Sequence, residues 1–184
     1  MLILIVMSNG LAISGDEGEH FREYGQDSPV MTANHNGAFL VGDPFVQHLK
    51  GAFHMWHIFD TGWKRYSPEV LQIIADRLEP DESQALPMAF QAGGLHHIYF
   101  CYRSAYDFRL NKDNINRLGY AYSDGLIHWH RDDSQSGIDL TESAWDSDMM
   151  CCPNTFECDG VVCLLYNGNE FSRHNFGLTK LIGM

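Results

Sequence analysis

The chain has 184 residues, of which 45% are hydrophobic, and this composition excludes an intrinsically disordered protein. Its formal net charge of −12 argues against binding to nucleic acid or to an anionic membrane surface, because both require surfaces rich in Lys and Arg. A neutral sugar or a cationic ligand is compatible with this charge. Aromatic residues at 12%, together with 17 glycines, favour short strands and tight turns, so we expect an all-β protein.

The N-terminal segment and the cysteines both indicate a cytoplasmic protein. Residues 1–7 are apolar but lack a basic region, and they are too short for a signal peptide or a membrane span, so we expect a buried strand. The chain has five cysteines, an odd number, and no C-x-x-C motif. Buried reduced thiols are therefore favoured over a disulfide framework. We expect no cofactor.

The next predicted elements are two hairpins and a helix. Residues 10–22 predict a strand, an acidic turn and a second strand. Residues 44–56 predict a longer hairpin, in which Gly51 follows Pro44 by seven positions and marks the turn. The Pro suits the first residue of a strand, where no N–H donor is needed. In residues 64–82 apolar side chains recur at helical spacing, which predicts a helix.

Both kinds of hairpin recur further along the chain. Residues 87–99 repeat the spacing of seven positions from Pro to Gly, and so do residues 153–165. Residues 119–131 repeat the shorter hairpin, and residues 177–181 repeat its first strand. The polar residues 132–151 predict a long connection between repeats.

The two hairpins together form a four-stranded antiparallel unit, which is the shape of a β-propeller blade. An ordinary β-sandwich is the alternative, but it gives no reason for one Pro-to-Gly spacing to occur three times. We therefore predict a single β-propeller-like domain, residues 1–184, with about three four-stranded blades.

Short blocks of sequence support this fold by resemblance. They lie at residues 43–46, 54–56, 81–87, 100–103, 107–109, 119–124, 145–149 and 166–171. With these blocks the chain resembles, over roughly residues 8–181, the five-bladed propeller proteins of glycoside hydrolase families 32, 43, 62 and 68 and their uncharacterised relatives. The resemblance implies a carbohydrate ligand in a central channel. It begins within the second blade of the family, so we expect an arc that lacks the first blade and its catalytic Asp.

The resemblance also assigns catalytic roles to two carboxylates. In the resembling enzymes an Asp before a Pro tunes and orients, and a Glu shortly before another Pro is the general acid. Asp43 and Glu82 match these positions. Glycoside hydrolysis needs two carboxyl groups about 5 to 9.5 Å apart, so we expect Asp43 and Glu82 to share one concave site. The alternative for each is a carboxylate in a turn or on the surface.

Further polar and aromatic residues are candidates for substrate binding. Arg103 follows an apolar strand and suits a carboxylate or a sugar hydroxyl, with an ion pair to Asp107 as the alternative. The amides of residues 166–170 suit sugar hydroxyls, although a plain Asn-Gly turn has the same sequence. The complete predicted set is Arg103, Asp107, Arg109, Asp146, Asp148, Asn167, Asn169 and Trp56. Trp63, Tyr99 and Tyr102, like Trp56, are either stacking platforms or core residues.

The histidine pairs do not predict a metal site. His96 and His97 are adjacent on a predicted strand and face opposite sides, whereas His128 and His130 share one face. No third ligand lies at metal-binding spacing.

Three functions remain from the sequence: a glycoside hydrolase, a non-catalytic carbohydrate-binding or assembly module, and a truncated relative without activity. An arc of about three blades leaves unpaired sheet edges, so we expect a homodimer in which each copy covers the open side of the other.

Overall fold

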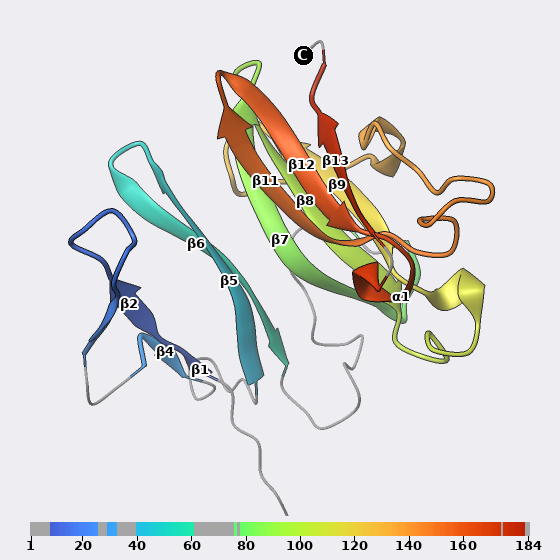
Figure 1. Ribbon diagram of the computed structural model, residues 1–184, viewed down its shortest axis with the longest axis horizontal. Coiled ribbons are helices and arrows are strands. Elements are labelled where there is room, and N and C mark those ends of the chain that lie inside the picture. The colour runs from blue at the N-terminus through green and yellow to red at the C-terminus, as the bar shows by residue number, and fades with distance from the viewer. Residues whose placement is uncertain are drawn as a thin grey trace, which may run out of the picture.

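The computed structural model describes residues 8–25, 29–32, 40–60, 76, 78–173 and 175–182, and these residues form an almost entirely β structure (Figure 1). The predicted strand at residues 1–7 lies outside the described residues, and so does most of the helix predicted in residues 64–82. No helix in the described part of the chain is long and apolar enough to cross a membrane.

The regular elements follow one another in chain order. The strands are β1 (Ser8–Asn9), β2 (Leu11–Ile13), β3 (Arg22–Tyr24), β4 (Met31–Thr32), β5 (Leu40–Leu49), β6 (Ala52–Asp60), β7 (Glu82–Ala92), β8 (Leu95–Ser104), β9 (Arg117–Ser123), β10 (His130–Arg131), β11 (Cys151–Cys158), β12 (Val161–Asn167) and β13 (Phe176–Lys180). The short helical turns are η2 (Lys112–Asn114), η3 (Asp133–Gln135) and α1 (Asn169–Ser172).

The longer strands form three antiparallel sheets that lie next to one another (Figure 1). The orders are β5-β6, β10-β9-β8-β7 and β11-β12-β13, and two small pairs, β1-β4 and β2-β3, precede them. Each predicted hairpin is present at its predicted place. Among the described residues the middle sheet alone has four strands, so the predicted four-stranded blade is complete there, whereas the other two sheets show two and three strands.

The three hairpins with the Pro-to-Gly spacing turn in the same way. Each closes through two residues with positive φ, which is the type I′ turn that matches the twist of a hairpin. Since an L side chain is strained at such φ values, a Gly stands at the second position of every turn. The turns are Lys50-Gly51, Gly93-Gly94 and Asp159-Gly160.

A β-bulge interrupts the first strand of each of these hairpins at its proline. The strand register shifts between Gly42 and Phe45, between Ala85 and Met88, and between Cys151 and Asn154. The three prolines therefore occupy equivalent positions, as the spacing predicts. They lie within long strands rather than at the first strand residue, because the bulge removes the need for an N–H donor there.

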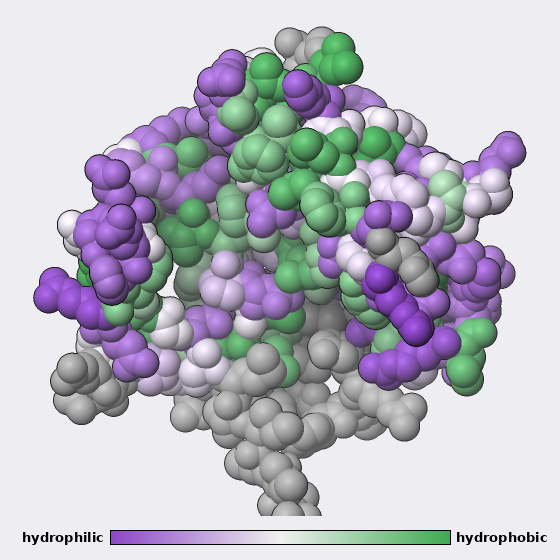
Figure 2. Space-filling view, viewed as in Figure 1, coloured by the Kyte–Doolittle hydropathy of each residue, from purple (hydrophilic) through white to green (hydrophobic). Residues whose placement is uncertain are grey.

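The core covers both faces of the four-stranded sheet, because successive strand residues alternate between the faces. Towards the β11-β12-β13 sheet, the core residues are Phe90, Tyr99, Leu118, Tyr120, Met150 and Leu164. Towards the β5-β6 hairpin, they are Ala89, Ile98, Phe100 and Ala121, packed against Phe45 and Trp56. Hydrophilic residues surround the face seen in Figure 2, and hydrophobic residues gather nearer its middle. This packing holds the three bulges on one side of the molecule.

Candidate functional site

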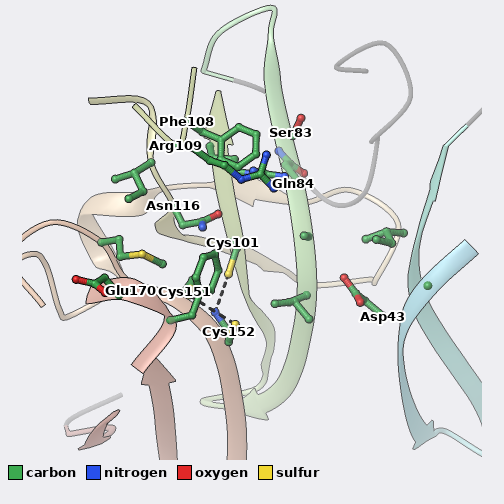
Figure 3. Close-up of a pocket in the computed structure, with 18 of the residues that line it drawn as sticks. Asp43, Ser83, Gln84, Cys101, Phe108, Arg109, Asn116, Cys151, Cys152 and Glu170 are labelled. Atoms are coloured by element: carbon green, nitrogen blue, oxygen red, sulfur yellow. Dashed lines mark hydrogen bonds between the residues drawn. The ribbon is translucent and has the colours of Figure 1, made fainter. Parts of the chain in front are cut away.

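The three proline bulges open onto one cavity of about 790 Å³ (Figure 3). The residue before each proline, Asp43, Leu86 or Cys152, lines this cavity. The volume lies within the range of about 300–1,000 Å³ that is usual for small-molecule sites. The repeat thus presents three equivalent side chains to one concave space.

Strained backbone is concentrated around the same cavity. Several lining residues other than glycine have a positive φ, namely Asp43 (46°), Leu86 (54°), Cys152 (52°), Glu170 (54°) and Phe171 (55°). Each such residue costs about 1–3 kcal/mol and persists only where its surroundings enforce it. Because residues of this kind cluster at binding and active sites, the cavity is the best candidate for a functional site.

Asp43 lies at the cavity, as expected for a carboxyl group with a role in the site. It lines the cavity and is half-buried. Burial raises the pKa of Asp43 above its ordinary value, and a hydrogen bond from the backbone N–H of Leu86 opposes this effect only in part. The group therefore holds a proton more readily than an exposed Asp does, which suits a general acid.

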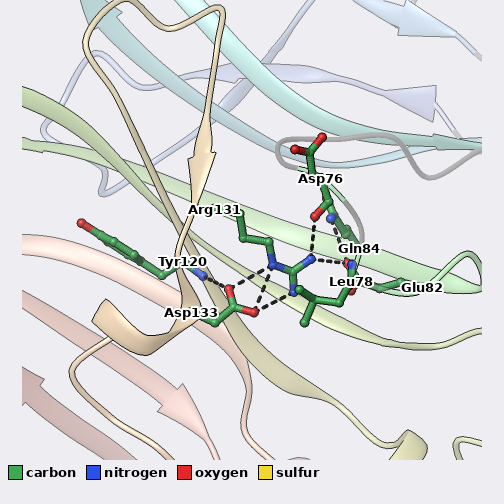
Figure 4. Close-up of polar contacts among 7 residues, drawn as sticks. All are labelled: Asp76, Leu78, Glu82, Gln84, Tyr120, Arg131 and Asp133. Atoms are coloured by element: carbon green, nitrogen blue, oxygen red, sulfur yellow. Dashed lines mark hydrogen bonds and ion pairs between the residues drawn. The ribbon is translucent and has the colours of Figure 1, made fainter.

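Glu82 lies elsewhere, and the structure does not bring it to the cavity with Asp43. Its side chain is 4% exposed, and its Oε1 accepts hydrogen bonds from Arg131 Nη1 at 2.6 Å and from Gln84 Nε2 at 2.9 Å (Figure 4). The backbone N–H of Leu78 donates to Oε2 at 3.1 Å. Among the described residues, the lining of the cavity includes Gln84 but not Glu82. Both carboxylate oxygens of Glu82 are engaged in this buried network.

Arg131, which was not among the residues predicted from the sequence, is the centre of that network. Its guanidinium also donates to Asp133 at 2.8 Å and to the carbonyl of Asp76 at 2.9 Å, and it lies 4.4 Å from the centroid of the Tyr102 ring. A buried guanidinium needs such partners, because its desolvation is otherwise costly. The sequence signal that could have identified Arg131 is a positively charged residue that follows Trp129 and His130 on a predicted strand.

The two predicted arginines do line the cavity. The Arg103 guanidinium lies 3.5 Å from the centroid of the Phe108 ring, and that of Arg109 lies 4.6 Å from it. Asp107, predicted with them, is exposed and is not among the described lining residues. Its carbonyl accepts the backbone N–H groups of Leu110 and Asn111, so Asp107 shapes the loop that carries the arginines.

Asp148 and Asn169, two of the candidate substrate-binding residues, also line the cavity. Lys112 Nζ lies 2.7 Å from both carboxylate oxygens of Asp148. Asn169 Oδ1 accepts the backbone N–H groups of Asp148 at 2.8 Å and Met149 at 3.1 Å. This side chain therefore holds the long connection against the turn α1.

Asp146, Asn167 and Trp56 are not among the described residues that line the cavity. Asp146 is buried and accepts hydrogen bonds from Thr141 Oγ1 at 2.5 Å and from the Tyr166 hydroxyl at 3.1 Å. Trp56 packs in the core, and Asn167 ends β12 opposite Cys151. These three residues are better explained by packing and loop support than by contact with a ligand in this cavity.

The cavity contains a cluster of thiols that sequence analysis treated only as core. Cys101, Cys151 and Cys152 line it, and all five cysteines are free, as predicted, although Cys158 is exposed rather than buried. The Cys151 and Cys152 sulfurs are 3.6 Å apart, and the backbone N–H of Cys152 donates to Cys101 Sγ at 2.9 Å. The hydrogen bond between the Cys151 and Cys152 sulfurs lowers the pKa of Cys152 to about 7, with a smaller contribution from Asn167.

The aromatic residues of the cavity differ from the predicted stacking platforms. Phe108 and Phe171 line it, whereas Tyr99 is buried in the core and donates its hydroxyl proton to the Ser136 carbonyl at 2.6 Å. Tyr102 lies beneath Arg131, and Trp63 is outside the described residues. Tyr99 and Tyr102 therefore belong to the core and its polar network.

One group of potential metal ligands lies away from the cavity, in the turn between β2 and β3. It consists of Asp16, Glu19 and His20, all exposed, with His20 Nδ1 2.7 Å from Asp16 Oδ2. Exposed acidic turns of this kind are common without an ion, and the histidine is engaged with the turn itself. His97 is instead buried, 2.6 Å from the Tyr120 hydroxyl.

Sequence comparison finds two similar curated proteins. No protein-family model matches the chain. Two proteins of Mycobacterium tuberculosis, described as uncharacterized proteins Rv1502 and MT1551, are each 27% identical to it over 191 residues. The matches cover 94% of this chain and 60% of each relative, so the chain spans about 60% of their length.

Comparison with solved structures decides the fold. A structure described as "Glycoside hydrolase" has a TM-score of 0.57 at 16% identity, covering 95% of this chain and 57% of its own. A structure described as a complex of BT0996 and RGII has a TM-score of 0.58 at 16% identity with the same coverage. An exo-1,5-α-L-arabinanase from a bovine ruminal metagenomic library has a TM-score of 0.54 at 9% identity, covering 93% of this chain and 64% of its own. The fold is that of propeller-type glycoside hydrolases.

Proposed function

We propose that the chain is a glycoside hydrolase-like protein that binds a carbohydrate in the cavity beneath its three proline bulges. The observation that carries this proposal is the convergence of Asp43, Leu86 and Cys152, all in strained backbone, on one cavity in a fold shared with glycoside hydrolases. The amide of Asn116 lines the same space and suits sugar hydroxyls.

Binding is better supported than hydrolysis for the residues that line this cavity. Hydrolysis needs two carboxyl groups in complementary protonation states. Asp43 suits the acid, but Asp148 is paired with Lys112, and Glu170 with Arg173 at 2.7 Å. Glycoside hydrolysis with Asp43 as the acid is therefore the second candidate, favoured by the raised pKa of that group alone.

A cavity-filling variant tests the proposal. Ala85 lines the cavity, so Ala85→Phe should block it, whereas Ala52→Phe makes the same change at an exposed strand position. On a panel of immobilised glycans, we expect the unmodified protein and Ala52→Phe to bind a common glycan, and Ala85→Phe to lose at least about tenfold in affinity, which corresponds to about 1.4 kcal/mol. No glycan binding, or equal binding by Ala85→Phe with its fold intact, would contradict the proposal.

Turnover of aryl glycosides distinguishes the two candidates. If the protein is a hydrolase, Asp43→Asn should abolish turnover while glycan binding remains. If the unmodified protein binds a glycan but does not hydrolyse the aryl glycosides, its function is carbohydrate binding without catalysis.

We also propose that the protein acts as a cytoplasmic homodimer, as expected from its sequence. The proposal is supported by β6, which pairs only with β5 among the described strands, and by exposed hydrophobic side chains on this hairpin. Phe53 is 80% exposed and Val46 is 50% exposed.

A further inference from the structure

We propose that the cavity selects an anionic sugar, carrying a carboxylate or a phosphate group, and that Arg103 and Arg109 bind the anion. This inference rests on the proposed function, since it names the class of carbohydrate. It reverses the expectation from the overall charge of −12, which by itself favours a neutral or cationic ligand.

Positive charge is concentrated at the cavity by two arginines. Arg103 and Arg109 are the two positively charged side chains among the described residues lining the cavity. The described structure contains no carboxylate within salt-bridge distance of Arg109. In a strongly acidic chain, two guanidinium groups at one cavity create a local site for an anion.

The acidic groups of the cavity oppose this positive charge only weakly. Asp148 is held by Lys112 at 2.7 Å, and Glu170 is held by Arg173 at 2.7 Å, so a cation outside the lining partly neutralises each carboxylate. Asp43 is half-buried and lies at the bulge of β5, and Figure 3 shows it well away from Phe108 and Arg109. Repulsion between these carboxylates and a bound anion near Phe108 is therefore limited.

The geometry of the two guanidinium groups also favours an anionic ligand. Both guanidinium groups lie against Phe108, at 3.5 and 4.6 Å from the ring centroid, which restricts their conformations before a ligand arrives. A planar guanidinium donates two parallel hydrogen bonds to a carboxylate or a phosphate, which a sugar hydroxyl cannot accept in the same way. Asn116 lines the cavity too, and its side-chain amide can both donate to and accept from the hydroxyls of a sugar ring.

Titration calorimetry with small sugars tests the inference. The probes are glucuronate, glucose 1-phosphate, glucose and inorganic phosphate, at low ionic strength and again at about 0.5 M salt. We expect glucuronate or glucose 1-phosphate to bind at least about tenfold more tightly than glucose, and to weaken with salt because the contact is ionic. The stronger of the two anionic sugars identifies the carboxylate or the phosphate as the preferred group.

Variants of Arg109 test whether this residue causes the preference for an anionic sugar. Arg109 is exposed, so Arg109→Gln should leave the fold intact while removing most of the preference for the anionic sugar. Arg109→Lys keeps the charge but lacks the planar fork, so it should retain only part of the preference. Arg22→Gln is the matched control, because Arg22 is equally exposed but lies on β3, and it should bind as the unmodified protein does.

The outcomes separate this inference from the function on which it rests. If glucose binds as tightly as both anionic sugars, or if Arg109→Gln keeps the preference, the anion site is refuted while carbohydrate binding stands. If inorganic phosphate binds as tightly as glucose 1-phosphate and glucuronate does not bind, the cavity holds an anion without selecting a sugar, and the inference fails. If no member of this set or of the glycan panel binds, the proposed function itself fails.

Discussion

Cys152 occupies the same bulge position as Asp43 and Leu86, so one backbone site in the repeat carries a thiol, a carboxyl or an alkyl group. The bulge fixes where each side chain points, and the residue type decides the chemistry. At Cys152 that chemistry depends on its neighbour, because the hydrogen bond between the Cys152 and Cys151 sulfurs lowers the pKa of Cys152.

The first prediction concerns the reactivity of Cys152. Because its pKa is lowered to about 7, the thiolate should predominate above that pH, and alkylation by iodoacetamide should rise with a midpoint near pH 7. In Cys151→Ala the hydrogen bond between the two sulfurs is lost, so the midpoint should move up towards the ordinary value of about 8.5. Peptide mass spectrometry against pH, in a Cys158→Ala background that removes the exposed thiol, measures both values. Identical midpoints in the two proteins would refute the assigned cause.

The second prediction concerns Glu82. Removing one partner of a buried ion pair leaves the other charge uncompensated, which costs about 3–5 kcal/mol. Arg131 keeps Asp133, so we expect Glu82→Gln to lower the free energy of unfolding by about 3 kcal/mol, at the lower end of that range. The exposed pair of Arg173 and Glu170 gives the control, since Arg173→Gln should change the free energy of unfolding very little. Urea unfolding measures both, and equal small losses would show that the Glu82 pair is not structural.

At the level of strands, two of the repeated glycines of the shorter hairpin, Gly119 and Gly177, have a steric cause. Gly119 pairs with Phe100 across the sheet, and Gly177 pairs with Tyr166 in the same way. A Cβ at Gly119 would lie 2.4 Å from the Phe100 ring, and one at Gly177 would lie 2.2 Å from the Tyr166 ring. An aromatic ring therefore covers a glycine in two successive sheets.

The third prediction follows from this packing. Gly119→Ala should overpack the sheet and lower the free energy of unfolding by about 1–3 kcal/mol. Gly125→Ala is the control, because nothing lies within 4 Å of a Cβ there. Replacing the ring with a smaller side chain, in the double variant Gly119→Ala with Phe100→Leu, should recover part of the loss. Thermal or urea unfolding tests the series, and an unchanged stability in Gly119→Ala would contradict the packing argument.

Hairpins could be predicted from the sequence because their signals are local: a Pro, a Gly seven residues later and apolar runs between them. The bulge at each Pro was not predicted, because the Pro was expected at the first residue of a strand, and it is the bulge that brings Asp43 to the cavity. The network of Glu82 could not be predicted in this way, since Arg131 is 49 residues away in the chain. Proximity to a Pro suggested a catalytic Glu, whereas tertiary packing gave that Glu a buried partner.

For the whole molecule, the fourth prediction concerns assembly. We expect a solution mass of twice the 20.9 kDa monomer at micromolar concentration, with an obligate interface of about 2,000 Å² or more. Placing a charge on the exposed hairpin with Phe53→Lys should dissociate the dimer. Leu110→Lys, at a side chain that is 89% exposed on another loop, should not. A monomer mass for the unmodified protein in light scattering would contradict the homodimer.

A crystal structure with the tightest-binding glycan of the panel tests the central claim, that the bulge cavity is a carbohydrate site, most directly. We expect electron density for the sugar inside the cavity, with its ring near Asn116 and Asp43 and any anionic group against Arg109. Density for the glycan elsewhere on the protein, with the cavity holding only water, would contradict it.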